Sequence, residues 1–128
     1  MASHRDDAAR LLRRSSADFL ALVNMRNPRK FDDNIFGFHA QQAVEKALKA
    51  WLAILGASYP FRHDLAELLA ALESHGQKVD DLWCLVDLTS FAVQLRYDEV
   101  DAGYPLDREA LIKAVGLLID RVQATPLT

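Results

Sequence analysis

The feature that most constrains this chain is the spacing of its apolar residues. They recur at intervals of three and four, the period of an α-helix, and no segment alternates apolar and polar residues as a strand would. The stretches are separated at proline and glycine positions, namely Pro28, Gly56, Pro60, Gly76, Gly103 and Pro105. The spacing therefore predicts five helices, over residues 6–25, 33–55, 64–75, 79–95 and 108–123.

Five helices with short connections predict an all-α fold, an antiparallel up-and-down bundle of four to five helices. A chain of 128 residues, 51% of them hydrophobic, is large enough to bury one core. We therefore expect residues 1–128 to form a single domain. Two helix starts are marked: Asp64 and Asp107 are N-cap candidates, and Leu106 and Leu111 are spaced as a hydrophobic staple around the second cap.

The helix expected over residues 33–55 has one broad apolar face and an opposite polar arc. The arc holds Gln41, Glu45 and Lys49 together with a rim of His39, Gln42, Lys46 and Lys49. Phe38 lies within this arc and Leu52 lies near it, so both are expected to be exposed. An apolar residue on the polar side of a helix indicates a second contact, and we predict that Phe38 and Leu52 touch a dimer partner.

The helix expected over residues 79–95 is apolar nearly all round, from Val79 to Leu95. A helix without a polar face is either central in a fold or shared with a partner chain. This pattern and Phe38 together predict a homodimer.

Composition and motifs exclude several classes of function. The net charge of −3 repels nucleic acid over the chain as a whole, so any such contact must be local. The glycine patterns of nucleotide-binding loops are absent, and the four histidines lack metal-ligand spacing, so no cofactor and no metal site are predicted. The only cysteine, Cys84, cannot form an internal disulfide, and neither a secretory signal nor an apolar membrane span is visible. We expect a soluble, cytoplasmic protein without a membrane partner.

Three features could bind an anion, and each also has a structural interpretation. The rim of His39, Gln42, Lys46 and Lys49 is either a cationic strip for phosphate or a solvated helix face. Arg62 and His63, in "RHDL", precede a helix whose amides could attract an anion, or they simply flank a capped start. The stretch "RYDEVDAGYPLDR" offers Arg96 for phosphate, with Tyr97 or Tyr104 for stacking on a base, or it is a solvated loop.

The run "FHAQQAVEKALKAWL", followed by "HDL" and then by "LRYD", resembles the HEPN domain family, whose name stands for higher eukaryotes and prokaryotes nucleotide-binding. The likeness covers about residues 5–123. It implies an all-α up-and-down bundle that usually pairs into a dimer. It also implies that a chain of this kind is often encoded beside a minimal nucleotidyltransferase, in pairs that look like toxin and antitoxin.

Other HEPN proteins are metal-independent ribonucleases that carry an arginine followed, after four to six residues, by a histidine. If Arg96 is that arginine, the positions open to the histidine are Asp101, Ala102 and Gly103, and no histidine occurs after His75. Cleavage through a 2′-hydroxyl needs a general base and a general acid. The resemblance therefore predicts binding without cutting, and no catalytic residue is assigned.

The sequence thus predicts a dimeric binding module for nucleotide or RNA that pairs with a nucleotidyltransferase. Its expected ligand contacts are Arg96, Tyr97, Asp101, Tyr104, His39, Gln42 and Lys46. One alternative is a ribonuclease whose base is Asp101, or whose site receives His39 or His63 through folding. A further alternative is a purely structural dimer subunit.

Overall fold

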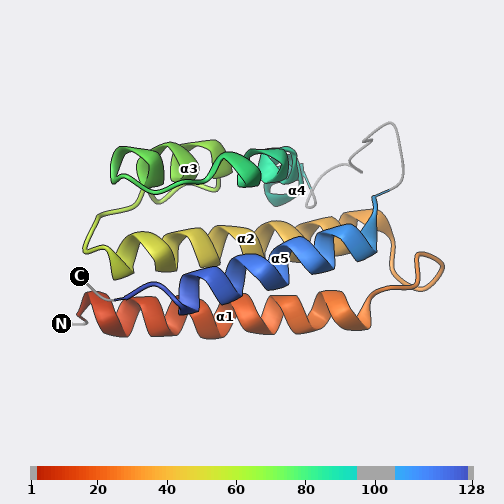
Figure 1. The fold of residues 1–128 in the computed structure, drawn as a ribbon. Helices are drawn as coiled ribbons and strands as arrows, with labels where there is room; N and C mark the ends of the chain where they lie inside the picture. Colours follow the sequence, from red (N-terminus) through yellow and green to blue (C-terminus); the bar gives the residue numbers. More distant parts are fainter. Residues whose placement is uncertain (1–2, 95–105, 127–128) are drawn as a thin grey trace.

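The structure is a computed structural model that describes residues 3–94 and 106–126. Its elements are α1 (His4–Asn24), α2 (Asp33–Ile54), α3 (Leu65–Ser74), the 3-10 helix η1 (Asp80–Leu88), α4 (Thr89–Gln94) and α5 (Arg108–Gln123). The described residues contain no strand, so the predicted all-α class is confirmed (Figure 1).

Four helices begin at a side chain that caps them. Asp64 accepts a hydrogen bond from the amide of Ala66, and Asp107 accepts one from the amide of Ala110, which confirms both predicted N-caps. Asp32 does the same for α2, and Ser3 forms a capping box with the third residue of α1. Short polar side chains therefore fix where these elements start, and two of the four caps, Asp64 and Asp107, were predicted from the sequence.

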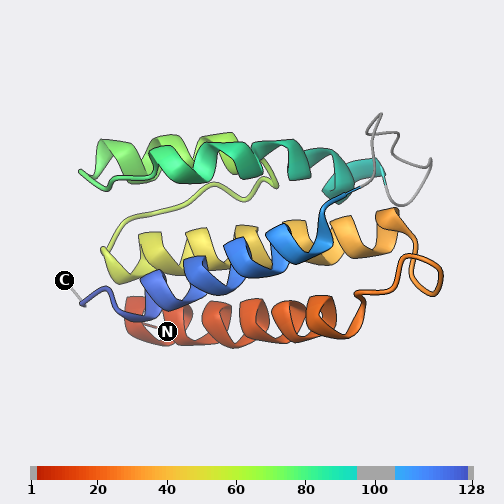
Figure 2. The same ribbon diagram turned by 45° about the vertical axis from the view of Figure 1, so that its right-hand side comes forward.

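The central element is α2, which contacts α1, α3, η1, α4 and α5. Helix α1 lies antiparallel beside it, α5 lies across the pair, and α3, η1 and α4 form a layer on the side of α2 away from α1 (Figures 1 and 2). The helix expected over residues 79–95 was predicted to be either central in the fold or shared with a partner chain. The structure gives the central position to α2 because small residues along that helix let its neighbours approach closely, including Ala40, Ala43, Ala47, Ala50 and Ala53, which are fully buried.

Helix α3 departs from a strict up-and-down order. The α2–α3 loop, residues 55–64, turns back along α2, so that Tyr59 lies over Lys49 and His63 lies beside Glu45. Helix α3 then runs parallel to α2 (Figure 2). The alternating directions are kept by α1, α2, the η1–α4 segment and α5, and α3 is an addition to that four-part bundle.

Residues 79–95 were expected to form one α-helix, and this prediction was wrong. Residues 80–88 are a 3-10 helix, and α4 follows from Thr89. A 3-10 helix has three residues per turn, so every third side chain faces the same way. Leu82, Leu85, Leu88 and Phe91 follow that spacing and are all buried, whereas Trp83 and Cys84 are exposed. The segment is therefore one-sided rather than apolar all round.

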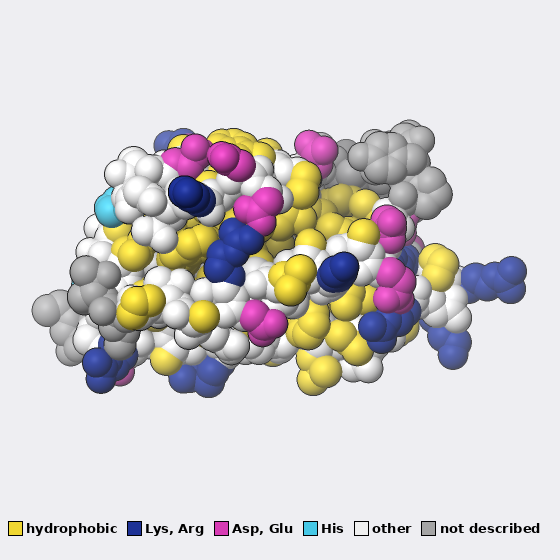
Figure 3. Space-filling model, in the orientation of Figure 1, with side chains coloured by type: hydrophobic (Ala, Val, Ile, Leu, Met, Phe, Trp, Pro, Cys, Tyr) yellow, Lys and Arg dark blue, Asp and Glu magenta, His cyan; other side chains and the backbone are white. Residues whose placement is uncertain are grey.

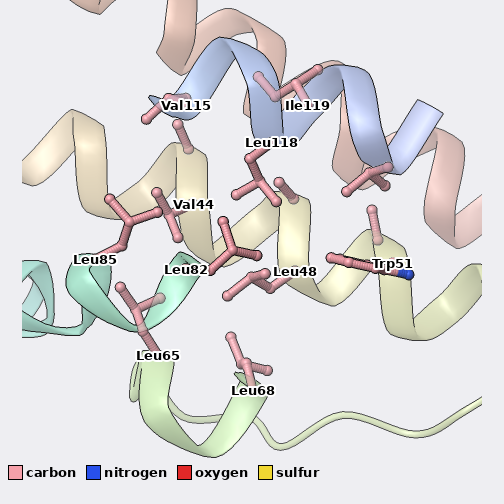
Figure 4. Packing of buried hydrophobic residues seen from close by; sticks show 14 of the residues in the cluster. Val44, Leu48, Trp51, Leu65, Leu68, Leu82, Leu85, Val115, Leu118 and Ile119 are labelled. Carbon is pink, nitrogen blue, oxygen red and sulfur yellow. The ribbon is translucent and has the colours of Figure 1, made fainter. Parts of the chain in front are cut away.

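The core lies on both sides of α2. Val44 and Leu48 of α2 gather with Leu118 of α5, Leu82 of η1 and Leu65 of α3 in one buried cluster (Figure 4). Leu52 belongs to the same core with no exposed surface. Its expected exposure, and with it the dimer contact assigned to it, is corrected, because a side chain that the chain itself encloses has no area left for a partner.

Candidate functional site

The four ligand contacts predicted within residues 96–104 cannot be placed. Arg96, Tyr97, Asp101 and Tyr104 lie outside the described residues. Their roles remain predictions.

The rim on α2 is engaged with α1. Lys46 Nζ donates to Asp18 Oδ2 over 2.9 Å, and His39 Nδ1 lies 3.0 Å from Asp18 Oδ1. Gln42 Nε2 donates to the side chain of Gln41 over 2.6 Å. These side chains are partly buried, so the rim is neither a fully solvated face nor an open cationic strip. Any phosphate that binds here must compete with the Asp18 carboxylate.

Phe38, the other residue expected to be exposed, is partly buried. Its ring meets the His39 ring edge-on with centroids 5.5 Å apart. It therefore keeps some surface for a partner, and its dimer contact remains a prediction.

The rest of the polar arc is buried, which corrects the expectation that it faces water. Glu45 is 4% exposed, Gln41 is fully enclosed and Lys49 is nearly so. The α2–α3 loop covers them as it turns back along the helix. Periodicity alone could not reveal this, because it locates a polar stripe but does not show that a loop lies over it.

The buried part of the polar arc, Gln41, Glu45 and Lys49, shares one hydrogen-bond network with the α2–α3 loop, and Glu45 is at its centre. Its Oε1 accepts from Gln41 Nε2 and lies 2.8 Å from His63 Nδ1, so a proton on Nδ1 donates to the carboxylate. Its Oε2 accepts from Lys49 Nζ over 3.1 Å. Gln41 also donates to the backbone carbonyl of His63 over 3.3 Å. The network fixes both the ring and the backbone of His63.

Burial by itself would raise the pKa of Glu45. The hydrogen bonds from Gln41 and His63, with the charge and hydrogen bond of Lys49, outweigh burial and hold the pKa below its ordinary value of 4.5. Glu45 is therefore ionised at neutral pH.

A second network joins the same loop to α1. Tyr59 donates from its hydroxyl to Asp7 Oδ2 over 2.7 Å, and Arg10 pairs with the same carboxylate. Burial and the bond to Asp7 raise the pKa of Tyr59. Lys49 Nζ lies 5.6 Å from the centre of the Tyr59 ring, in cation–π contact. The loop is thus held by α1 on one side and by α2 beneath.

Between these anchors the loop turns three consecutive side chains outward. Phe61 is 95% exposed, the Arg62 side chain is 77% exposed, and the His63 side chain is 56% exposed. We call Phe61, Arg62 and His63 the loop crown. Arg62 pairs with Glu67 over 3.1 Å at the surface. Arg62 and His63 were predicted from the sequence as possible anion contacts. Phe61 was missed, although its place between Pro60 and an arginine is a signal that could have identified it.

The start of α3 offers fewer open amides than the sequence suggested. The amide of Ala66 donates to its cap, Asp64, and the amide of Leu65 donates to Thr89 Oγ1 over 3.2 Å. The second bond ties the loop to the first residue of α4. The loop crown therefore cannot rely on these two amides for an anion.

Arg108 is the last residue of the stretch "RYDEVDAGYPLDR", and its contacts are structural. It is buried, and it donates to the carbonyls of Met25 and Phe31 and to the Asp33 carboxylate over distances of 2.6 to 3.0 Å. Its guanidinium also stacks on the Phe36 ring, 4.8 Å from the ring centre. These contacts join the start of α5 to the α1–α2 turn.

Two cavities open near the start of α5. One, of about 300 Å³, has mixed charge, with lining residues Arg26, Pro28, Asp33, Leu106, Asp107, Arg108 and Glu109. The other, of about 250 Å³, is mostly apolar and lies between η1 and α5, where hydrophobic side chains gather in Figure 3. Its lining includes Leu85, Leu88, Ala110, Leu111 and Ala114. The second cavity suits an apolar contact, whereas three carboxylates in the first disfavour a phosphate.

Residues 3–94 and 106–126 hold no group of three or more His, Cys, Asp or Glu side chains placed to bind a metal ion. None of the helices in those ranges combines the length and apolar character that a membrane crossing requires.

Comparison with known proteins gives one family. A model of the HEPN domain matches residues 8–125, which is nearly the whole chain. No curated protein and no solved structure gives a significant match.

Proposed function

Because the chain belongs to the HEPN domain family, we propose that it is a nucleotide- or RNA-binding module rather than one of the family's ribonucleases. One observation carries the proposal. No histidine follows His75, so none stands four to six residues after Arg96, where a ribonuclease of the family has its proton-transferring group. An arginine alone can hold phosphate charge, but it cannot move the protons that cleavage requires.

The position of His39 supports binding over cleavage. His39 faces Asp18 of α1. Helix α4 packs against the opposite side of α2, where the Phe91 ring lies within 2.4 Å of the point that a Cβ on Gly37 would occupy. Since α4 is the element that precedes Arg96 in the sequence, His39 is directed away from it.

We propose that Arg96 binds phosphate and that Tyr97 stacks on a base, with Asp101 and Tyr104 completing the contacts. His39, Gln42 and Lys46 can add to the site only by exchanging Asp18 or Gln41 for the ligand. We therefore expect Arg96 to dominate the affinity.

Titration with labelled ATP and with a short single-stranded RNA tests this function. We expect saturable binding of at least one ligand, weakened about tenfold by Arg96→Ala, because a charge-assisted hydrogen bond contributes about 1.5 to 3 kcal/mol. Arg13→Ala, at an exposed position of α1, is the matched control and should leave the affinity unchanged. If the chain binds neither ATP nor RNA, the proposed function is refuted.

One observation favours a second candidate, a ribonuclease with an unusual base. His63 is held at Nδ1 by the buried Glu45 carboxylate while its ring remains accessible, which is how a carboxylate orients a general base. Incubation with mixed RNA in the presence of a metal chelator separates the candidates. Cleavage that disappears in both His63→Ala and Arg96→Ala would establish the enzyme, and intact RNA supports the binding module. A chain that binds neither ATP nor RNA would fit the third alternative, a purely structural subunit.

We also propose two protein partners. The first is a second copy of the chain, which would cover the apolar cavity between η1 and α5. In support, exposed Leu117 extends the same face of α5, seven residues after Ala110. The second is a minimal nucleotidyltransferase, in a pair resembling toxin and antitoxin. Two observations test this partner: a reading frame for a small nucleotidyltransferase beside that of this chain, and co-purification of the two proteins from the native host.

A further inference from the structure

The loop crown is the part of the described surface that the fold itself does not explain. Phe61 has the most exposed ring of any described large hydrophobic residue, so it contributes almost no packing to the core. Within residues 3–94 and 106–126 its aromatic neighbour is Tyr59, whose ring lies at 63° to it with centroids 6.3 Å apart, so the two rings are not stacked in parallel. An exposed aromatic ring followed by an arginine and a histidine offers a ligand an apolar face beside a cation.

The crown is carried on a loop that is fixed rather than loosely attached. Glu45 and Gln41 hold His63, Asp7 holds the Tyr59 hydroxyl, and Thr89 holds the amide of Leu65. Burying the charges of Glu45 and Lys49 costs desolvation free energy, and apolar residues could close a loop at a lower cost. The network is therefore better explained by the position that it gives to the crown than by the stability it adds.

We propose that the loop crown is a binding site for single-stranded RNA, in which a base stacks on the Phe61 ring and the adjoining phosphate is held by Arg62. His63 presents Nε2, the ring nitrogen not directed at Glu45, to the phosphate or to a 2′-hydroxyl. This inference rests on the proposed RNA-binding function and names a second contact for it, beside the contact assigned to Arg96.

The chemistry of the crown favours RNA over a protein partner. A protein interface needs several apolar side chains side by side, whereas Phe61 is the one large hydrophobic residue of the loop that is exposed. Stacking needs only one ring, because every base has a π face. The surface ion pair between Arg62 and Glu67 contributes little, so Arg62 can exchange it for a phosphate at small cost.

The test measures the fluorescence anisotropy of a labelled single-stranded RNA of about twelve nucleotides, with the same sequence as a duplex for comparison. We expect Phe61→Ala to weaken single-strand binding about tenfold and Phe61→Tyr to keep the wild-type affinity, because the tyrosine retains the ring. Arg62→Ala should weaken binding and reduce the dependence of affinity on salt by about one phosphate contact. The duplex, whose bases are already stacked, should respond little to Phe61→Ala.

Two exposed residues of α1 supply matched controls. Leu20→Ala removes an exposed apolar side chain, and Arg13→Ala removes an exposed cation. Neither should change the affinity. Since Phe61 and Arg62 are exposed, all four alanine variants should keep the wild-type helical circular dichroism and melting temperature.

The outcomes separate this inference from the proposed function. If the wild-type chain binds RNA and Phe61→Ala binds equally well, the crown site is wrong while the proposed function stands. If the wild-type chain binds neither RNA nor ATP, both are wrong. If Phe61→Ala leaves RNA affinity unchanged but abolishes capture of a purified nucleotidyltransferase partner, the crown docks a protein and the RNA site is refuted.

Discussion

At the scale of single residues, Glu45 is the side chain of α2 that joins Gln41, Lys49 and His63 into one network. Its carboxylate forms hydrogen bonds with the Gln41 amide, the His63 imidazole and the Lys49 ammonium group, although it is almost completely buried. A buried carboxylate of this kind is retained only when its partners satisfy it, and each partner in turn depends on it.

Glu45→Gln should therefore destabilise the fold by about 3 kcal/mol, because the amide leaves the Lys49 ammonium buried without its counter-charge. Urea unfolding followed by circular dichroism measures the change. Glu67→Gln is the control, since the exposed pair of Glu67 with Arg62 contributes less than about 1 kcal/mol. If Glu45→Gln and Glu67→Gln lower the free energy of unfolding equally, the structural role assigned to Glu45 is contradicted.

The lowered pKa of Glu45 also makes a prediction about acid stability. The carboxylate binds a proton more weakly in the folded chain than in the unfolded chain, where its pKa is near 4.5. The unfolded state therefore takes up the proton first as pH falls. The stabilisation is fully present above about pH 4.5 and is lost as the pH falls through the folded pKa.

The measurement is the unfolding free energy of wild type and Glu45→Gln in urea at pH values from 7 down to 3. The difference between the two chains should be constant above the ordinary pKa and should shrink below it. A difference that grows on acidification would reverse the sign and refute the assignment.

At the scale of elements, α4 approaches α2 through a glycine. A Cβ on Gly37 would lie 2.4 Å from Phe91 Cδ1, closer than two carbon atoms can approach. Alanine usually stabilises a helix by about 1 kcal/mol relative to glycine. Here the clash dominates, because the Phe91 ring is buried and has little space into which to retreat.

Gly37→Ala should destabilise the chain by about 2 kcal/mol, and adding Phe91→Leu should recover part of that loss. Gly116→Ala is the matched comparison. Its Cβ would lie 3.2 Å from Phe19 Cζ, and the Phe19 ring is only partly buried and can shift. We expect a change within about 0.5 kcal/mol there. Thermal unfolding of the three variants checks the predicted order of their stabilities. If Gly37→Ala does not change the stability, α4 can move away from α2 to accept the extra methyl group.

The same elements show how far the sequence could predict the fold. Helix starts at Asp64 and Asp107 were visible because a capping side chain acts on amides two or three residues away. The 3-10 form of residues 80–88 could not be predicted, since Leu82, Leu85 and Leu88 also suit an apolar α-helix. Only the observed three-residue repeat of burial distinguishes the two.

The candidate site was predicted in part, for a related reason. Arg62 and His63 were recognised from their place before a helix, but the burial of Glu45 and Lys49 depends on a loop that returns along α2. Such a contact joins residues about 18 positions apart, as the bond between His63 and Glu45 does, and helical periodicity holds no information on it.

At the scale of the whole molecule, the apolar cavity between η1 and α5 is the contact that we propose for a second copy. Ala110 lines it and is exposed, so a larger charged side chain there need not disturb the core. Ala110→Glu would place a carboxylate inside an apolar contact, where an unpaired charge is costly, and should weaken the dimer at least tenfold.

Light scattering at micromolar concentration should give a dimer mass for the wild-type chain and a monomer mass for Ala110→Glu. Gln123→Glu adds the same charge at an exposed position near the end of α5, outside the cavity lining, and should remain dimeric. Unchanged helical circular dichroism in both variants would attribute the loss of mass to the interface rather than to unfolding. A wild-type monomer would refute the dimer itself. A dimeric Ala110→Glu would move the interface elsewhere, and Phe38, which keeps part of its surface on the other side of α2, would be the next position to substitute.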